Sequence, residues 1–328
     1  MSDPRANTVR VVAHPNIALA KYWGKKPGAG NIPAVPSLSV TLEGMKTTTS
    51  VTFDEGLGSD HFLLNGVETI GEGARRLHGL LDRVRLLSGE RRRARVVSEN
   101  DFPTASGLAS SASGFAALAL AATRAAGVDL DASAVASIAR ESSASAARSI
   151  FGGFAELDTE GAARQVAPLD QINLRVLVCV TTDAQKSIGS TAGMNETAKK
   201  SPFYAAWCEA APHIYAELRA ALLEKNFSRM GACAESSALA MHGSAMAAGI
   251  LYFNGATNAA LAEVRKMREE NLLAYATIDA GPHVKVLVQT RDADIAAQRL
   301  TKVPGVLRVL TTRPGGAARV EPTSGGGV

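Results

Sequence analysis

Aromatic residues, cysteines and charges are all scarce in this sequence, and each shortage narrows the possible classes of protein. Phenylalanine, tryptophan and tyrosine make up only 5% of the 328 residues, while alanine and glycine are abundant. We therefore expect helices that pack closely through small side chains. The three cysteines are widely spaced and form no Cys-x-x-Cys pair, so neither a disulfide framework nor a cysteine metal site is indicated. Charged residues reach 20% against 46% hydrophobic residues, which argues against wholesale disorder.

Long apolar runs and concentrated charge are also missing. No run is long enough to span a membrane, and residues 1–7 are polar and lack the apolar core of a signal peptide, so we expect a cytoplasmic protein without a membrane partner. The formal net charge is +4, and its densest group is the arginine run at 91–93. No nucleic-acid-binding module accompanies this run, so we expect no nucleic-acid partner. A mild positive field suits a small anionic substrate.

The most informative segment is residues 103–114, which read Pro-Thr-Ala-Ser-Gly-Leu-Ala-Ser-Ser-Ala-Ser-Gly between a strand-like run and a helical run. Small residues let a ligand approach the backbone, and the unpaired N–H groups of a helix start favour an anion. Ser110 and Ser111 add hydroxyls for phosphate oxygens or a bound cation. The segment lacks both the Gly-Lys-Ser/Thr of a Walker loop and a Gly-x-Gly-x-x-Gly fingerprint. A phosphate cradle and a tightly packed core helix explain it equally well.

Hydrophobic periodicity predicts strands and helices that are mixed but do not alternate strictly, which favours an α+β fold. Asn65-Gly66 predicts a hairpin turn, and residues 131–145 read as one helix. We expect two intimately packed halves with a ligand cleft between them, and a Gly/Pro-rich tail that is disordered. The predicted boundaries are 1–180, 181–312 and 313–328.

Four further segments carry candidate functional side chains. Lys21 and Lys25 would share a face of a helix, where two cations repel unless they bind a common anion. Asp279 ends a strand-like run before Gly-Pro, and Arg148 follows a serine-rich stretch. Residues 186–194 could be a capped helix start. Each segment also has a simpler explanation: surface lysines, a turn aspartate, a solvated arginine and an ordinary helix cap.

Taken together, these segments resemble the mevalonate diphosphate decarboxylases of the GHMP kinase superfamily. The Asn-Ile-Ala-x-x-Lys-Tyr-Trp-Gly-Lys and Phe-Pro-Thr-Ala-x-Gly-Leu-Ala-Ser-Ser-Ala-x-Gly runs of that family are its most specific motifs. The resemblance is collinear from about residue 8 to residue 310, and its motifs match residues 16–25, 102–114, 145–153, 190–194 and 279–282. It implies a GHMP-kinase fold and a homodimer.

The resemblance implies ATP and Mg²⁺ as cofactors and a phosphorylated mevalonate as the substrate. Asp279 would be the general base on the 3-hydroxyl, Lys21 would support it, and Arg148 would hold the substrate carboxylate. Residues implied to line the substrate phosphates are Tyr22, Lys25, Arg75, Ser143, Ser145 and Met194. Residues implied to bind ATP are Ser106, Gly107, Leu108, Ala109, Ser110, Ser111 and Ser190, with Ser111 near Mg²⁺.

The sequence departs from the family at the substrate end, where Ser142 and Ala144 replace two glycines. If either position needs a positive φ or a close approach to phosphate, a Cβ would interfere. His14 replaces a usual proline. The implied product is isopentenyl diphosphate, and a phosphomevalonate decarboxylase is the first alternative. A mevalonate 3-kinase without decarboxylation is a second, disfavoured by Asp279 and Lys21, and a non-catalytic ligand-sensing relative is a third.

Overall fold

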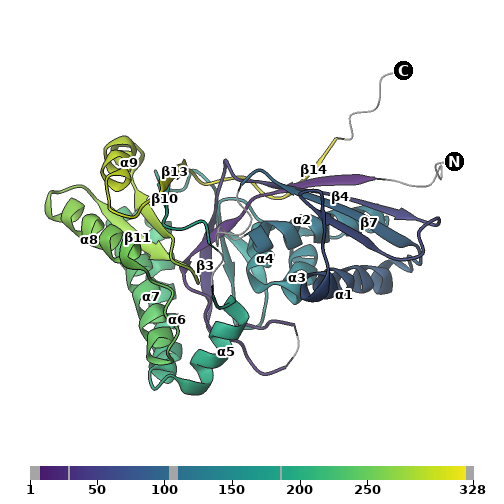
Figure 1. Ribbon diagram of the computed structural model, residues 1–328, viewed down its shortest axis with the longest axis horizontal. Helices are drawn as coiled ribbons and strands as arrows, with labels where there is room; N and C mark the ends of the chain where they lie inside the picture. Colours follow the sequence, from purple (N-terminus) through teal and green to yellow (C-terminus); the bar gives the residue numbers. More distant parts are fainter. Residues whose placement is uncertain (1–7, 29, 103–109, 185–186, 323–328) are drawn as a thin grey trace.

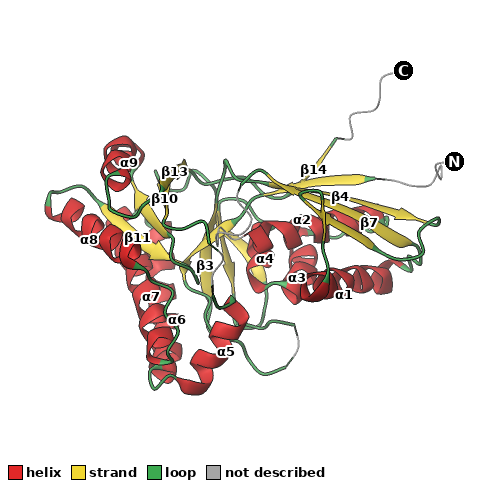
Figure 2. Cartoon of the chain, viewed as in Figure 1, coloured by secondary structure: helices red, strands yellow, loops and turns green. Residues whose placement is uncertain are grey.

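The structure is a computed structural model that describes residues 8–28, 30–102, 110–184 and 187–322. Helices and mostly antiparallel strands form separate layers, as Figures 1 and 2 show, so the α+β prediction is confirmed. No helix in these ranges is long and apolar enough to cross a membrane.

The first layer is a six-stranded sheet whose buried face is covered by helices. In spatial order its strands are β14 (Arg319–Glu321), β1 (Val9–Ala13), β4 (Thr47–Asp54), β7 (Arg93–Asn100), β5 (His61–Leu64) and β6 (Val67–Glu68). Helix α2 (Ser110–Ala125) lies against β1 and β4. The helices beside it are α1 (Gly71–Ser88), α3 (Ala132–Ser142) and α4 (Ala144–Ser149).

Two four-stranded sheets follow, and they share one hydrophobic core with the long helices α6 (Tyr204–Leu223) and α7 (Phe227–Ala247). One sheet has the order β2 (Asn16–Ala20), β3 (Ser37–Thr41), β8 (Phe154–Leu157), β9 (Ala163–Ala167). The other has the order β11 (Ala274–Ile278), β12 (Val284–Val288), β10 (Arg175–Val180), β13 (Arg308–Thr312). The remaining helices are α5 (Ser190–Lys200), α8 (Gly255–Glu269), the 3₁₀ turn η1 (Thr290–Asp292) and α9 (Ala293–Thr301).

Strands β11 and β12 are buried on both faces, which explains their almost uninterrupted apolar sequence. Tyr275 and Leu287 face the core shared with the second sheet, whereas Ala276 and Val286 face a separate core under α8 and α9. The odd-numbered residues of this strand pair therefore point toward the N-terminal part of the chain.

Local predictions from turn chemistry agree with the structure better than predictions of helix length. The turn at Asn65 and Gly66 has φ angles of 50° and 77° and joins the antiparallel strands β5 and β6, as predicted. The predicted helix at 131–145 is wrong as a single element, because Ser143 is extended (φ −157°) and separates α3 from α4. Lys21 and Lys25 do not lie on a helix, because the chain before them forms strand β2.

The prediction of a disordered tail over 313–328 is wrong for the part that the structure describes. Residues 319–321 form β14, which pairs antiparallel with β1. Before it, Gly315 donates to the Thr41 carbonyl and accepts from the Gly153 amide. A Cβ on Gly152 would lie 2.5 Å from the Ala317 nitrogen, so the returning backbone needs this glycine. Residues 323–328 lie outside the described residues.

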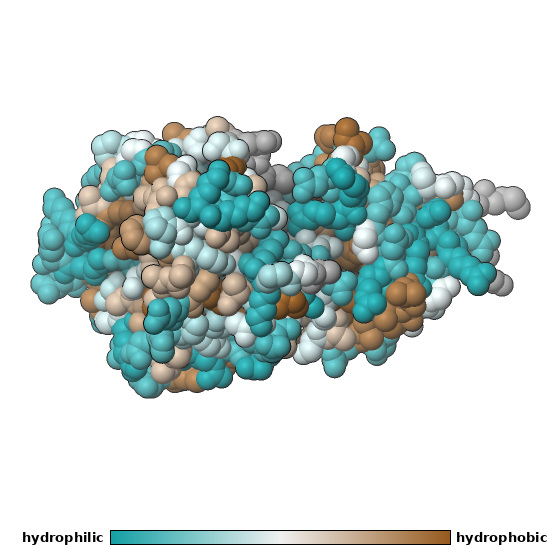
Figure 3. Space-filling view, turned by 90° about the horizontal axis from the view of Figure 1, so that it is seen from below, coloured by the Kyte–Doolittle hydropathy of each residue, from teal (hydrophilic) through white to brown (hydrophobic). Residues whose placement is uncertain are grey.

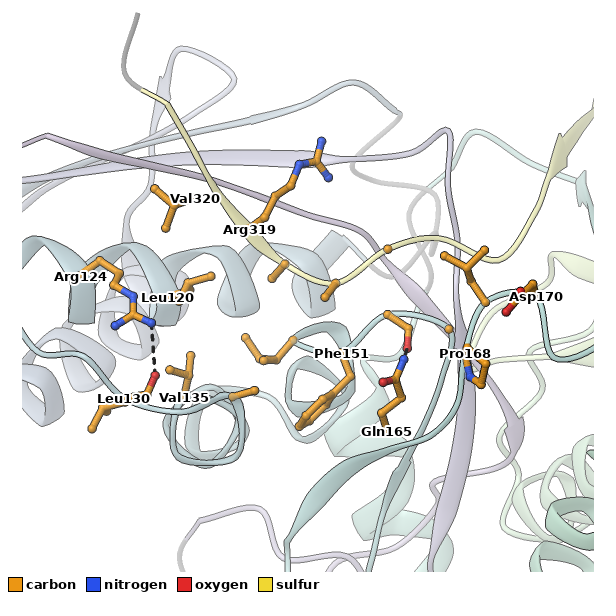
Figure 4. A pocket seen from close by; sticks show the side chains of 18 residues that line it. Leu120, Arg124, Leu130, Val135, Phe151, Gln165, Pro168, Asp170, Arg319 and Val320 are labelled. Carbon is orange, nitrogen blue, oxygen red and sulfur yellow. Dashed lines mark hydrogen bonds between the residues drawn. The ribbon is translucent and has the colours of Figure 1, made fainter. Parts of the chain in front are cut away.

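The returning segment forms one wall of a hollow of about 750 Å³ between α2, α3 and β9. Figure 4 shows Arg319 and Val320 on this wall, opposite Leu130 and Val135. The residues that line the hollow include none of the predicted site residues.

Close packing through small side chains, as predicted, is clearest where α7 crosses β11. A Cβ on Gly231 would lie 2.2 Å from the Tyr275 ring, whereas a Cβ on Gly243, on the exposed side of the same helix, would meet nothing within 4 Å. The helix can therefore approach the sheet this closely only because Gly231 has no side chain.

We expect Gly231→Ala to destabilise the fold by about 1–3 kcal/mol, because the methyl group overpacks the interface with Tyr275. Gly243→Ala is the matched control, and should stabilise the fold by up to about 1 kcal/mol through helix propensity alone. Urea unfolding of both variants measures the difference. Equal effects at the two positions would contradict this account of the packing.

Candidate active site

The centre of the candidate site is an ion pair between residues 258 positions apart. Lys21 directly follows β2, and Asp279 directly follows β11. The Lys21 Nζ lies 2.7 Å from Asp279 Oδ1 and also donates to the Ala18 carbonyl, while the Lys21 backbone amide donates to Ser237 Oγ. The Lys21 side chain is 2% exposed and that of Asp279 is 27% exposed. The carboxylate therefore remains accessible to a ligand, while the ammonium is buried against the Ala18 carbonyl.

A second lysine, which the sequence analysis missed, completes this centre. Lys285 of β12 places its Nζ 3.2 Å from Asp279 Oδ2, and its side chain is 3% exposed. A lysine at an odd-numbered position of a strand buried on both faces is the signal that could have identified it.

Burial and neighbouring charges have opposite effects on the pKa values of this centre. Burial alone would raise the pKa of Asp279, but Lys21 and Lys285 outweigh it and hold this pKa well below its usual range. Burial lowers the pKa of Lys21 to about 8; Asp279 opposes the shift, while Lys285 and Arg148 add to it. Burial also lowers the pKa of His242, whose Nε2 lies 3.2 Å from the Ile278 carbonyl, to about 4. At neutral pH one carboxylate therefore faces several cations.

Arg148, from the short helix α4, is the third buried cation and is 2% exposed. Its guanidinium donates to Ser37 Oγ at 2.7 Å and lies 3.4 Å from Asn16 Oδ1. Asn16 is fixed in turn, because its amide donates to the Ser145 carbonyl and to Ser149 Oγ. Arg148 Nε has no hydrogen-bond partner within the described ranges, which leaves a donor for a ligand. Burial lowers the pKa of Arg148 to about 10, so it stays charged at neutral pH.

Three of the predicted phosphate-binding side chains, Lys25, Ser143 and Ser145, have polar neighbours in the structure. Lys25 Nζ donates to Asn31 Oδ1 at 2.7 Å and to Thr191 Oγ1 at 3.2 Å. Burial and the nearby Arg76 lower the pKa of Lys25, as expected for two cations without an intervening anion. The hydroxyls of Ser143 and Ser145 lie 3.2 Å apart.

Tyr22 and the residues at positions 142 and 144 complete the description of this region. The Tyr22 hydroxyl is buried without a hydrogen-bond partner among the described residues, and burial raises its pKa. Ser142 ends α3 and Ala144 begins α4, and neither has a positive φ. The concern that the missing glycines strain the backbone therefore does not apply.

Arg76, and not its neighbour Arg75, contacts the serine-rich segment. Arg75 is exposed, whereas Arg76 donates through Nε to the Ser142 carbonyl at 3.0 Å and lies 4.5 Å above the centre of the Phe115 ring. Helical spacing explains the difference, because Arg76, Leu80 and Val84 share a face of α1, and the latter two are buried.

Met194 is a core residue in the structure and does not line an open surface. It is 3% exposed and lies in a hydrophobic cluster with Trp23 and Trp207, against which Tyr22 packs. The same helix, α5, instead reaches the candidate site through Thr191, its contact with Lys25. Ser190 is the first residue of this helix.

The predicted nucleotide loop is only partly described. Ser106, Gly107, Leu108 and Ala109 lie outside the described residues. Ser110 and Ser111 begin the 16-residue helix α2, whose first turn carries no acidic residue, so its dipole is free to favour a phosphate. Within the described ranges no three His, Cys, Asp or Glu side chains form a metal site. A magnesium ion here would be held through phosphate oxygens and hydroxyls such as that of Ser111.

The electrostatics of Lys21 give a test that needs no substrate. Its pKa is about 8 in the folded chain and has the ordinary value of 10.5 in the unfolded chain, so between these values the unfolded state binds more protons. Raising the pH from about 7.5 to about 9.5 should therefore stabilise the wild type relative to Lys21→Met by about 2 kcal/mol. Urea unfolding at both pH values measures this.

Lys26→Met is the matched control for this experiment, because Lys26 is an exposed lysine five positions further on whose side chain is 43% accessible. Its difference from the wild type should stay constant with pH. A constant difference for Lys21→Met as well would contradict the account of a buried, strained ammonium.

Comparisons with known proteins agree along the chain. Residues 13–167 match the diphosphomevalonate decarboxylase-like N-terminal domain, and residues 176–312 match the mevalonate 5-diphosphate decarboxylase C-terminal domain. The human diphosphomevalonate decarboxylase is 34% identical over 372 residues, covering 99% of this chain and 91% of the human protein. The phosphomevalonate decarboxylase of Haloferax volcanii is also 34% identical, covering 84% of this chain and 86% of its own.

Solved structures give the same result. The mevalonate diphosphate decarboxylase of Staphylococcus aureus has a TM-score of 0.90 and 34% identity, with 96% of this chain and 98% of that chain covered. A neighbour described as MDDEF in complex with MVAPP, AMPPCP and magnesium has a TM-score of 0.90 and 35% identity, with 97% and 100% covered. The expected GHMP-kinase fold is confirmed, and the chain belongs to the diphosphomevalonate decarboxylase family.

Proposed function

We propose that this chain catalyses the ATP-dependent decarboxylation of mevalonate 5-diphosphate to isopentenyl diphosphate, ADP, phosphate and CO₂. The observation that carries the proposal is the charge balance of the centre, where Asp279 faces the buried cations Lys21, Lys285 and Arg148. Buried cations in excess of their carboxylate partners need an anionic ligand. A substrate with a carboxylate at one end and phosphates at the other supplies that charge.

Asp279 is the candidate for the general base on the 3-hydroxyl. Its pKa is held well below the usual range, so it stays ionised and accepts a hydrogen bond from the substrate hydroxyl at neutral pH. Lys21 supports this carboxylate and offers a positive charge to oxygen atoms that become negative. Bound MgATP would supply the phosphoryl group that turns the hydroxyl into a leaving group.

Arg148 is the candidate for holding the substrate carboxylate. Loss of the 3-phosphate breaks the C3–O bond, and the electrons of the C–CO₂ bond form the new double bond as CO₂ departs. The guanidinium must orient the carboxylate without binding it tightly, because strong binding in the ground state would raise the barrier. Two protein contacts, to Ser37 and Asn16, fix the arginine for this task.

The phosphate end of the substrate would lie between α1, α4 and the chain after β2. Lys25 and Arg76 supply the charge, and Tyr22, Ser143 and Ser145 supply hydroxyls. Ser110 and Ser111 at the start of α2, with Ser190 on α5, would contact the nucleotide phosphates, and Ser111 would lie near Mg²⁺. Met194 supports this region from the core. The homodimer implied by the resemblance and the cytoplasmic location expected from the sequence stay predictions.

The proposal is tested by measuring CO₂ and ADP release with MgATP on mevalonate, its 5-phosphate and its 5-diphosphate. We expect matched CO₂ and ADP with the diphosphate. In Asp279→Asn, turnover should fall by about a thousandfold or more while nucleotide affinity is retained, because the variant loses only the base. Surviving turnover would refute the role of Asp279.

The remaining outcomes separate the alternatives. Preference for the monophosphate would indicate a phosphomevalonate decarboxylase, ADP without CO₂ would indicate a 3-kinase, and no ADP with any substrate would indicate a non-catalytic relative.

A pair of adjacent arginines tests the phosphate end. Arg76→Met should raise KM for the phosphorylated substrate about tenfold or more, because it removes a charge held beside Lys25. Arg75→Met removes the same charge from the neighbouring, exposed position and should leave KM unchanged. Steady-state kinetics of both variants decide the point, and equal effects would show that only net charge matters.

A further inference from the structure

We propose that Lys285 is a positioning residue for the reaction, which together with Lys21 holds the two oxygens of the Asp279 carboxylate and fixes its plane. The inference rests on the proposed function. Lys21 Nζ takes Oδ1 at 2.7 Å and Lys285 Nζ takes Oδ2 at 3.2 Å, so each oxygen has its own lysine.

Lys285 reaches this carboxylate from a central strand of the third sheet. Strand β12 lies between β11 and β10, and Lys285 is opposite Thr277 on one side and Val178 on the other. Its side chain is on the same face as Leu287, toward the core shared with the N-terminal part of the chain. Thr277 on that face donates to the Ala18 carbonyl, so this register is tied to the segment that carries Lys21.

A lysine at this position needs an explanation, because its neighbours on the strand are valines and leucine. Burying an ammonium costs several kcal/mol, and an aliphatic residue would continue the pattern of the strand at no such cost. Within the described part of the chain, Lys285 forms its ion pair with Asp279. The contact with this carboxylate, and not packing, therefore explains why a charged residue stands at this position.

The second lysine changes what the carboxylate can do. A carboxylate held through one oxygen still rotates about its Cβ–Cγ bond, whereas one held through both oxygens does not. Fixed orientation matters, because a misplacement of about 1 Å can cost about a hundredfold in rate. Lys285 also lies near Lys21, and its charge helps to lower the pKa of Lys21. The other groups that act on Lys21 or are acted on by it are the charged Arg148 and the buried His242, which is neutral at neutral pH.

Lys285→Met tests the inference. We expect kcat to fall by about 10- to 100-fold with KM for ATP and substrate changed by less than about threefold, because binding groups are intact but the base is free to rotate. Loss of the Lys285 charge should also raise the pKa of Lys21 above about 8. Two features should therefore move to higher pH: the alkaline limb, which is the fall of kcat/KM as Lys21 loses its proton, and the rise in stability that follows loss of this proton from the folded chain.

Val286→Ala is the matched control, because Val286 is the next residue on β12 but faces the other core. It should lower the unfolding temperature and leave kcat and the alkaline limb unchanged. Lys285→Arg keeps the charge and should restore the alkaline limb. We expect Lys285→Met to fold, because removing one of several clustered cations relieves repulsion. If it does not fold, Lys285→Gln provides the same test.

The outcomes separate the two proposals. Wild-type turnover together with an unchanged kcat and alkaline limb in Lys285→Met would overturn the inference and leave the proposed function standing. A parallel loss in Lys285→Met and Val286→Ala would show a merely structural role and also overturn it. Absence of turnover by the wild type with all three substrates would overturn the proposed function, and the inference with it.

Discussion

The contact between Lys21 and Asp279 is the constraint on which the rest of the site depends. The two residues follow strands of different sheets, and a distance of 2.7 Å between their charged atoms requires the two sheets to keep a fixed relative position. The hydrophobic core that both sheets share with α6 and α7 fixes that position. Because neither sheet holds the pair alone, the candidate site exists only when the two parts of the chain are packed together.

The same constraint explains the electrostatic character of the site. Burying ammonium and guanidinium groups is costly, and a single aspartate does not neutralise those gathered around it. The protein supplies backbone carbonyls and hydroxyls to hold these groups in place, and leaves the balance of charge to a ligand. On the surface shown in Figure 3, hydrophobic side chains lie in separate groups among hydrophilic ones.

Sequence alone predicted the fold class, the hairpin at Asn65 and most of the residues that gather at the centre, because these follow from turn chemistry and from motifs that retain their order. It did not identify Lys285: the apolar strand marks this lysine as unusual, but its partner is fixed only by the register of three strands, which the sequence does not contain. The choice between Arg75 and Arg76 depended on the rotation of α1. The tail was misjudged because a glycine such as Gly315 can reflect a close approach to the backbone of Leu42 and Glu43 as well as disorder.

The path of the chain has a mechanical consequence. The backbone leaves the first two sheets after β9, builds the third sheet, and returns after β13 to pair with β1. Two covalent tethers, at residues 168–174 and 313–318, thus join the two parts. A cut in one tether would leave the other in place, so the two parts would stay connected, either through the peptide chain or through the pairing of β14 with β1.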